Sequence, residues 1–385
     1  MAAINMNSNP ETKTSKKIAL FYPNFAGGGA ECVGLWMLEA LKNQYDLTLF
    51  TISDVDFNQL NVMYGTQLDQ QTVKVRSIFN QGLRKPLEFL RANNADIRML
   101  QFHILLRYLK SHCHEYDLVI SAYNAADMGC KGMQYIHWVK VLEQKKLYNK
   151  VSNFSWESMT SNLSIANSKY VAQRFKTLYD VEPLVIYPPV VMDVQDVPWE
   201  QKENTFICSG RLTKPKEPHK VIEILSRVRD QGFDIKLCLT GGGGGTYAIG
   251  YQRFLQKMID QNSDWITLYK NLPYQDYIKV MSKCRYGIHC KQEPFGISIA
   301  EMVKAGAIPF VKNKGGQVEI VGEENQDLLF ANPEEATQKI VNLLSNPGRG
   351  EKMRKSMYER RYLFGSDRFM SEMQNLVNSY FDNPN

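Results

Sequence analysis

The chain lacks the sequence signals of a secreted, disulfide-bonded or membrane-spanning protein. Its seven cysteines are odd in number, form no Cys-x-x-Cys pair and mostly stand in apolar strand or helix patterns. Such cysteines are typical of buried, reduced thiols and indicate a reducing compartment. Residues 1–17 are polar, without the apolar stretch of a signal peptide, and no run of about 20 apolar residues occurs. We therefore expect a disordered tail over residues 1–17, no transmembrane helix and a cytoplasmic location.

The standard motifs of dinucleotide- and ATP-binding proteins are also missing. The glycine cluster at residues 26–31 follows an apolar run and precedes a helical pattern, but Gly-x-Gly-x-x-Gly fails at its last position, which is Cys32. The Gly-Lys-Ser/Thr of a Walker loop is absent too. The glycines would still let a ligand's phosphate approach backbone N–H groups at a helix start, and the alternative is a simple tight turn.

Length and charge narrow the class of protein further. The chain has 385 residues, which predicts two or three domains, and 44% of them are hydrophobic, enough for sizeable cores. The formal net charge of +6 is mild. It favours anionic ligands or a membrane surface and gives no reason to expect nucleic acid.

Apolar runs of strand length alternate with segments of helical spacing, which predicts parallel α/β units in both halves of the chain. In the first half, the expected strands are 17–22, 47–52, 117–121, 132–137 and 163–167, with helices over 31–43 and 168–179. The second half has expected strands at 205–209, 235–240, 265–269, 286–290 and 308–311, and helices over 218–231, 248–261, 274–283, 298–305, 334–345, 348–361 and 366–380.

A polar linker over residues 193–204 separates the two halves. We therefore predict an α/β protein of two doubly wound, Rossmann-like domains that face a central cleft. The first covers residues 18–192 and the second residues 205–365. Ligands of such sheets bind beyond the carboxyl ends of the strands.

The segment Glu293-Pro-Phe-Gly-Ile-Ser-Ile-Ala-Glu301 is the most informative motif. A strand pattern precedes it, so we expect Glu293 at a strand's end and Glu301 about two turns into the following helix. The free N–H groups of that helix start favour an anion between the two carboxylates. A ligand with phosphates in its middle and hydroxyls at both ends, such as a nucleotide-sugar, has this shape.

Cationic and polar residues follow other strands of the second half. Arg211 and Lys216 stand five positions apart in a proline-stiffened loop and can neutralise a diphosphate as a leaving group; the alternative is a solvated basic turn. Lys270 and Leu272 follow the expected strand 265–269, where backbone groups can line a pocket for the base of a nucleotide.

Two further candidates lie in the first half. His137 ends a strand on the side of the expected cleft, although a lone histidine is more often structural. Asp54 and Asp56 form an Asp-x-Asp that could hold a metal beside a diphosphate. Because the Arg211 and Lys216 pair already supplies cations, we expect no metal and no other cofactor.

The segment 84–110 is basic and amphipathic, with six basic and two acidic residues. Such a helix can lie on an anionic membrane, which would make the protein peripheral at the inner or cytosolic membrane face. An ordinary core-facing helix with a solvated basic face is the alternative.

Taken together, these motifs resemble the retaining glycosyltransferases of family 4, which have the GT-B architecture. The resemblance rests on Glu-x7-Glu with its Pro-Phe-Gly and on Gly-Arg-x4-Lys, and it covers nearly the whole chain after residue 17. Ala-Gly-Gly-Gly-Ala-Glu, Tyr-Ile-His and Ile-Tyr-Pro-Pro are most similar to mannosyltransferases that elongate lipid-linked oligosaccharides. In this architecture the C-terminal helix often crosses back, which would place residues 366–385 on the N-terminal, acceptor-side domain.

The resemblance implies a role for each matching residue. Glu301 would hold the ribose hydroxyls of the donor, and Glu293 would contact the transferred sugar. The amides of Phe295, Gly296 and Ile297 would hold the donor's distal phosphate or its sugar, with His137 at the sugar and the acceptor. The diphosphate would be gripped by Arg211, Lys216 and the loop of Gly27, Gly28 and Gly29.

The resemblance thus implies metal-independent, retaining transfer of a hexose from GDP-mannose or a UDP-sugar to a glycan or lipid-linked acceptor. Two alternatives stay open: a sugar-nucleotide epimerase of the same architecture, and a non-catalytic nucleotide-sugar-binding scaffold. The five glycines at 241–245 and Lys214-Pro-Lys216 followed by Glu-Pro depart from the family pattern and leave the geometry of those loops open.

Overall fold

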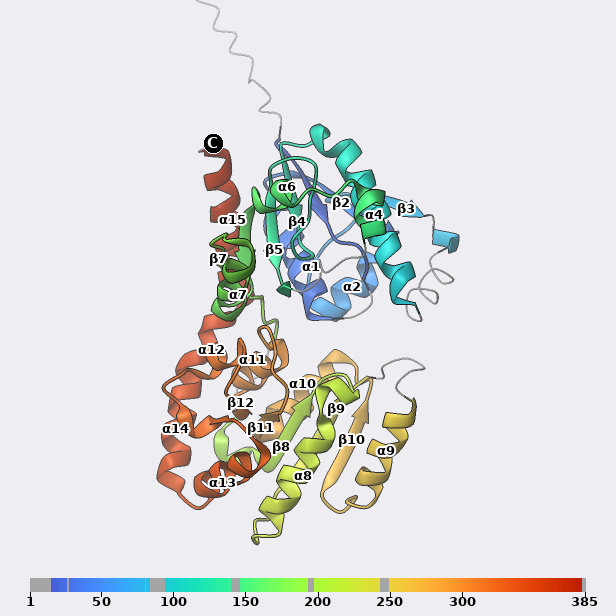
Figure 1. The fold of residues 1–385 in the computed structure, drawn as a ribbon. Coiled ribbons are helices and arrows are strands. Elements are labelled where there is room, and N and C mark those ends of the chain that lie inside the picture. Colours follow the sequence, from blue (N-terminus) through green and yellow to red (C-terminus); the bar gives the residue numbers. More distant parts are fainter. Residues whose placement is uncertain are drawn as a thin grey trace, which may run out of the picture.

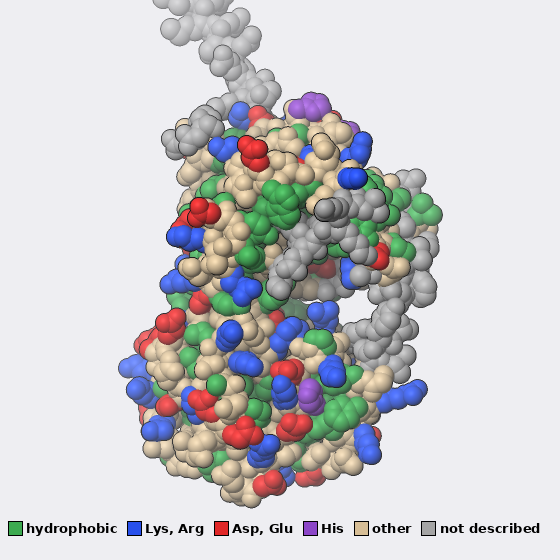
Figure 2. Space-filling view, in the orientation of Figure 1, with side chains coloured by type: hydrophobic (Ala, Val, Ile, Leu, Met, Phe, Trp, Pro, Cys, Tyr) green, Lys and Arg blue, Asp and Glu red, His purple; other side chains and the backbone are tan. Residues whose placement is uncertain are grey.

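The protein folds into two α/β domains, one above the other, each built around a parallel sheet (Figure 1). The computed structural model describes residues 15–25, 28–79, 81–83, 94–139, 146–192, 197–242 and 249–382. The prediction of two Rossmann-like domains is confirmed, and Figure 2 shows a hollow between the two halves of the molecule.

The N-terminal sheet has the strand order β3-β2-β1-β4-β5-β6-β7, and all of its pairs are parallel. The order reverses between β1 and β4, so the loops after these strands diverge and leave room for a ligand at the carboxyl edge. The strands are β1 Lys17–Phe21, β2 Asp46–Ser53, β3 Val73–Phe79, β4 Leu118–Ser121, β5 Met133–Ile136, β6 Leu163–Ala166 and β7 Leu184–Val185. The helices are α1 Gly29–Leu41, α2 Phe57–Tyr64, α4 Ala95–His112, α5 Lys146–Ser152, α6 Trp156–Thr160 and α7 Lys169–Tyr179.

The C-terminal sheet has the order β10-β9-β8-β11-β12-β13, with the corresponding reversal between β8 and β11. Its strands are β8 Glu203–Ser209, β9 Lys236–Gly241, β10 Ile266–Lys270, β11 Cys284–His289, β12 Ile308–Lys312 and β13 Leu329–Phe330. Its helices are α8 Pro218–Arg229, α9 Ile249–Asp260, α10 Tyr274–Lys283, α11 Ile297–Lys304, α12 Gln317–Val321, α13 Pro333–Leu344 and α14 Pro347–Arg360. The chain closes with α15 Ser366–Asp382.

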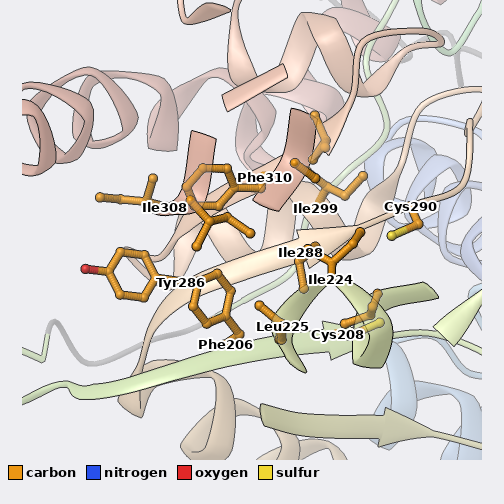
Figure 3. Close-up of a cluster of buried hydrophobic side chains, with 14 of the residues drawn as sticks. Phe206, Cys208, Ile224, Leu225, Tyr286, Ile288, Cys290, Ile299, Ile308 and Phe310 are labelled. Carbon is orange, nitrogen blue, oxygen red and sulfur yellow. The ribbon is translucent and has the colours of Figure 1, made fainter. Parts of the chain in front are cut away.

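The core of the C-terminal domain lies between its sheet and the covering helices (Figure 3). Phe206 of β8 stacks on Tyr286 of β11, with 4.9 Å between ring centroids, and Phe310 of β12 lies beside them. Both faces of these central strands are covered by helices, which explains why they read in sequence as continuous apolar runs. The packed sheet gives the loops at its carboxyl edge a rigid base.

The last helix, α15, packs against α1 of the N-terminal domain. Phe369, Met373 and Val377 recur at helical spacing and are buried in the N-terminal core. Gln374 Nε2 donates to the carbonyl of Ala40 at 2.6 Å. The chain therefore crosses between the domains twice, and the two crossings meet where Val190 forms a parallel bridge with Gly365.

Some boundaries and short elements differ from those expected. Lys17 is the first residue of β1 and its N–H donates to Asp117 at 2.8 Å, so the expected tail over residues 1–17 is too long; residues 1–14 lie outside the described part. Of the polar linker, Lys202 is buried and donates to carbonyls of the C-terminal domain. The sequence did not predict α2, β3, α5, α6, β7, α12 or β13.

Candidate active site

Glu293 lies at the carboxyl edge of the C-terminal sheet, four residues after the end of β11. Its Oε1 accepts hydrogen bonds from Lys216 Nζ at 2.6 Å and from His289 Nε2 at 3.1 Å. Burial alone would raise the pKa of Glu293, but the His289 hydrogen bond and the Lys216 charge outweigh it and lower the pKa to about 2. Glu293 is therefore a carboxylate at any physiological pH.

The backbone of the Glu293 loop is fixed from the start of α12. Gln317 is fully buried; its Oε1 accepts from Glu293 N–H at 2.6 Å, and its Nε2 donates to Lys291 O at 2.9 Å. Gly316 must be glycine, because an added Cβ would stand 2.1 Å from Pro294 O. Phe295 is also buried and packs against core aromatics, so its side chain supports the loop and only its backbone can face a ligand.

Glu301 lies on the half-buried face of α11. Because α11 begins at Ile297, Glu301 is the fifth helical residue, little more than one turn in. The expected two turns are wrong because the helix starts only four residues after Glu293, behind the left-handed cap residue Gly296. Its Oε2 accepts from Tyr277 OH at 2.7 Å. Burial raises the pKa of Glu301 to about 7, although the Tyr277 hydrogen bond opposes the shift.

The start of α11 faces the start of α1 from the other domain. A Cβ added to Gly29 would stand 2.5 Å from Ile297 Cδ1, so the two helix starts are nearly in contact. Gly28 and Gly296 occupy the cap positions and offer no side chain to the first N–H groups. Both helix starts thus favour an anion. Gly27 lies outside the described residues.

The other predicted donor-site residues lie along the same edge of the C-terminal sheet. Arg211 is exposed in the loop after β8, where Leu212 N–H donates to Gly242 O at 3.0 Å. Lys270 ends β10, but its Nζ reaches Gln256 of α9 at 3.1 Å, so its side chain is turned to the outer edge of the domain. Half-buried Leu272 follows it.

Opposite, His137 directly follows β5 of the N-terminal domain. It is half-buried, and its Nε2 lies 2.9 Å from Ala122 O, an acceptor, so Nε2 carries the proton and Nδ1 is the acceptor. Burial lowers the pKa of His137 to about 4. The ring is therefore neutral at pH 7, which suits contact with an uncharged sugar hydroxyl. Asn124 Oδ1 accepts from His137 N–H at 2.8 Å and fixes the loop.

Both carboxylates of the Asp-x-Asp pair accept hydrogen bonds within the N-terminal domain. Asp54 Oδ1 accepts from Ser77 Oγ at 2.7 Å, and Asp56 caps α2 by accepting from Gln59 N–H at 3.2 Å. Among the described residues, no group of three or more His, Cys, Asp or Glu side chains is arranged to hold a metal.

Sequence reasoning missed three residues of this site: His289, Tyr277 and Gln317. His289 stands four positions before Glu293 at the end of the same strand, a signal that could have been used. Tyr277 contacts the Glu301 carboxylate and Gln317 contacts the backbone N–H of Glu293, each across 24 residues and from a different element, so only the folded chain brings them there.

The fold is that of a two-domain GT-B protein. Residues 193–363, a range that includes Lys216, Glu293 and Glu301, match the family of glycosyl transferases group 1. The chain therefore contains a glycosyl transferases group 1 domain over these residues.

Several curated proteins are similar to the chain in sequence. The chain is 24% identical over 263 residues to a GDP-Man:Man(3)GlcNAc(2)-PP-Dol alpha-1,2-mannosyltransferase of Dictyostelium discoideum, covering 62% of this chain and about half, 51%, of that protein. The Homo sapiens protein of the same name is 21% identical, with 88% and 82% covered. Spore coat protein SA of Bacillus subtilis is 23% identical, with 60% and 64% covered.

Solved structures share the fold. Anabaena Alr3699/HepE, crystallised with UDP and glucose, superposes with a TM-score of 0.66 at 15% identity, covering 94% of this chain and 100% of that one. WaaG, a glycosyltransferase involved in lipopolysaccharide biosynthesis, also gives 0.66, at 13% identity and with 94% and 99% covered.

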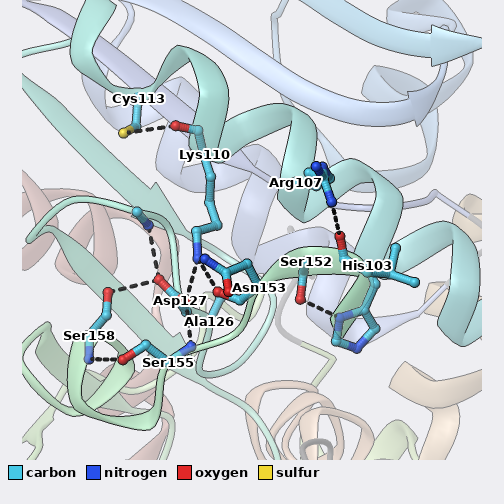
Figure 4. Close-up of polar contacts among 12 residues, drawn as sticks. His103, Arg107, Lys110, Cys113, Ala126, Asp127, Ser152, Asn153, Ser155 and Ser158 are labelled. Atoms are coloured by element: carbon cyan, nitrogen blue, oxygen red, sulfur yellow. Dashed lines mark hydrogen bonds and ion pairs between the residues drawn. The ribbon is translucent and has the colours of Figure 1, made fainter. Parts of the chain in front are cut away.

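The predicted basic amphipathic segment falls largely on α4; residues 84–93 lie outside the described part. Two of its basic side chains are engaged within the protein: Lys110 Nζ pairs with Asp127 at 2.5 Å, and Arg107 Nη1 donates to Val151 O at 3.1 Å (Figure 4). Leu100 and Ile104 remain 39% and 38% exposed. Within the described ranges, no helix has both the length and the apolar character to cross a bilayer.

Proposed function

We propose that this protein is a retaining glycosyltransferase of family 4 that moves a hexose from a nucleoside-diphosphate sugar to a glycan or lipid-linked acceptor. One observation carries the proposal: the Lys216–Glu293 ion pair and Glu301 flank the start of α11, and the start of α1 faces it from the other domain. The names of the relatives favour GDP-mannose as donor. The Anabaena protein was crystallised with UDP and glucose, so UDP-sugars are the alternative donors to be tested.

The donor would bind with its diphosphate between the two helix starts. Glu301 would accept hydrogen bonds from the ribose hydroxyls, while Lys216 and Arg211 neutralise the diphosphate. Glu293, already ionised, would accept from hydroxyls of the hexose, and neutral His137 would contact the hexose from the N-terminal domain. These contacts would put the anomeric carbon at the cleft between the domains.

In the proposed reaction, the bond between the anomeric carbon and the diphosphate breaks, and the acceptor hydroxyl bonds to that carbon from the same face. The departing phosphate oxygen takes the hydroxyl proton, so the products are a glycoside of unchanged anomeric configuration and a nucleoside diphosphate. The protein would stabilise the negative charge that develops on the departing diphosphate, and Lys216 is the residue proposed to do so.

Thermal-shift measurements with GDP-, UDP-, ADP- and dTDP-sugars test the donor. Because a ligand that binds only the folded state raises stability by RT ln(1 + [L]/Kd), the correct donor at 100 Kd should add ~2.7 kcal/mol. NMR of the product's anomeric signal then tests retention. Donor isomerisation without acceptor would indicate the epimerase instead, and donor binding without any turnover would indicate the scaffold.

Metal independence is a separate expectation. Excess EDTA should leave the transfer rate within about twofold of the untreated enzyme, because the cations that face the diphosphate belong to Lys216 and Arg211. The assay compares initial rates with and without chelator, and with Mg²⁺ or Mn²⁺ restored. Complete loss that Mn²⁺ reverses would contradict the assignment and return attention to Asp54 and Asp56.

A lipid-linked acceptor implies contact with a membrane at its cytosolic face. Exposed Leu100 and Ile104 of α4, with exposed Arg98 beside them, are the surface we propose for it. Cosedimentation with vesicles containing anionic lipid should decrease in the variant Leu100→Ser/Ile104→Ser. Equal sedimentation of wild type and variant would leave α4 as the ordinary core-facing helix.

A further inference from the structure

Glu319, on α12 of the C-terminal domain, contacts the N-terminal domain. Its two carboxylate oxygens accept hydrogen bonds from the N–H groups of Lys169 and Tyr170, each at 2.8 Å. These are the first two N–H groups of α7, an 11-residue helix. A carboxylate at a helix N-terminus is stabilised both by these hydrogen bonds and by the helix dipole. Tyr187 OH, from the segment that connects the domains, donates to Glu319 at 3.0 Å.

A second set of contacts joins the same start of α7 to the Glu293 loop. Ser168, the cap residue of α7, accepts from Val171 N–H within its own helix and donates from its hydroxyl to Pro294 O at 2.7 Å. Gln292 Nε2 donates to the hydroxyl of Tyr170. The residues on either side of Glu293 are thus both bound by the N-terminal domain.

The backbone of α12 is in turn fixed to the C-terminal domain. Arg360, at the end of α14, donates to the carbonyls of Glu319 and of Ile320, and Gln317, two residues before Glu319, holds the N–H of Glu293. The side chains of Gln317 and Glu319 therefore connect the loop of Glu293, through one short rigid helix, to α7 of the other domain.

We infer that Glu319 is a positioning residue for the proposed transfer: by capping α7 from the opposite domain, it fixes the approach of the two domains and the place of Glu293. This inference rests on the proposed function but concerns a residue without a contact to the donor. If the domains separate at this contact, Glu293 loses the Pro294 and Gln292 contacts on both sides, and His137 moves away from the C-terminal half of the site. A displacement of about 1 Å at reacting groups can cost ~10²-fold in rate.

The test compares Glu319→Ala and Glu319→Gln with wild type in the full chain. Glu324→Ala is the matched control, because Glu324 has the same charge, is 64% exposed and pairs with Arg360 at 3.1 Å within the C-terminal domain. We expect kcat to fall at least about 10-fold in Glu319→Ala, while the Kd of GDP or UDP, measured by calorimetry, stays within about threefold. The kcat of Glu319→Gln should lie between those of wild type and Glu319→Ala. The glutamine amide keeps one acceptor oxygen, but its NH₂ group would face the second N–H of α7, which is also a donor.

Hydrogen–deuterium exchange at the amides of residues 169 and 170 provides a readout that does not require activity. These amides should exchange at least about 10-fold faster in Glu319→Ala than in wild type or Glu324→Ala. Unchanged exchange would overturn the inference, and so would a loss of nucleotide affinity as large as the loss in kcat, since damage would then lie within the C-terminal domain. If the chain transfers no sugar, the proposed function fails through its own assay while the exchange measurement still decides whether Glu319 holds the domains together.

Discussion

Glu293→Ala and Lys216→Ala are each expected to lower sugar transfer by ~10³-fold or more while the chain stays folded. Removing a single group that stabilises charge in a transition state typically costs ~10²–10³-fold in kcat, and these two side chains also fix one another, at 2.6 Å. If Lys216 contacts the diphosphate as proposed, Glu293→Ala removes the partner that holds Lys216 in place, and Lys216→Ala removes the positive charge itself. Initial rates at saturating donor measure both.

Because the two residues act as one unit, the double variant should lose little more activity than either single variant. The matched control is Arg227→Ala, which removes a cation of α8 whose ion pair with Glu334 is exposed, with side chains 47% and 69% accessible. Exposed pairs contribute only ~0–1 kcal/mol, so this variant should keep near-normal rates. Turnover like wild type in Glu293→Ala or Lys216→Ala would remove both residues from the site.

The low pKa of Glu293 also fixes the sign of a pH effect on stability. A carboxylate whose pKa is lowered on folding adds stability above its unfolded pKa and loses it as the pH falls through the folded value. The contribution of the Lys216–Glu293 pair should therefore be complete above pH 4.5 and decline toward pH 2. In the neutral range, Glu293 should give the transfer rate no inflection.

The sheets could be predicted from sequence because their central strands are buried on both faces. Segments such as 18–21 and 206–208 are then continuous apolar runs, a pattern that needs no knowledge of the fold. The edge strand β3 is only partly buried, and its burial pattern shows one buried residue in seven. Short elements such as α6 are held by tertiary contacts, so their local sequence carries little signal.

In the candidate site, too, the residues placed by local sequence could be predicted, and those placed by contacts between distant segments could not. The spacing of Glu293 and Glu301 is local, since one strand, one turn and one helix place them both. Lys216 lies 77 residues from Glu293, and the sequence assigned it to a diphosphate without predicting that it pairs with that carboxylate. Glu319 contacts α7 across about 150 residues. Contacts at such separation depend on how the two domains approach, which no periodicity of apolar residues encodes.

Glu301 should make donor binding depend on pH near neutrality. If the ribose hydroxyls donate to this side chain, the ionised form binds best, and with a pKa of about 7 the ionised fraction falls about 10-fold between pH 8 and pH 6. The Kd of the donor should rise by the same factor over that range. In Glu301→Gln, the Kd should be higher at pH 8 and nearly independent of pH. Calorimetric titrations at several pH values measure both.

The free energy of unfolding should also depend on the ionisation of Glu301. It should fall as the pH rises, whereas donor binding should strengthen. Burial raises the pKa of Glu301 above its unfolded value, so the folded chain binds the extra proton, and the stability due to this group is complete below pH 4.5 and lost as the pH rises through 7. Glu301→Gln should therefore unfold at a higher temperature than wild type at pH 8, although it binds donor more weakly. Tyr277→Phe removes the hydrogen bond that lowers the Glu301 pKa, so it should move the binding curve to higher pH. A parallel loss of stability and affinity in Glu301→Gln would mean that the carboxylate serves the fold and not the donor, because only a ligand site retains a buried charge that the fold alone disfavours.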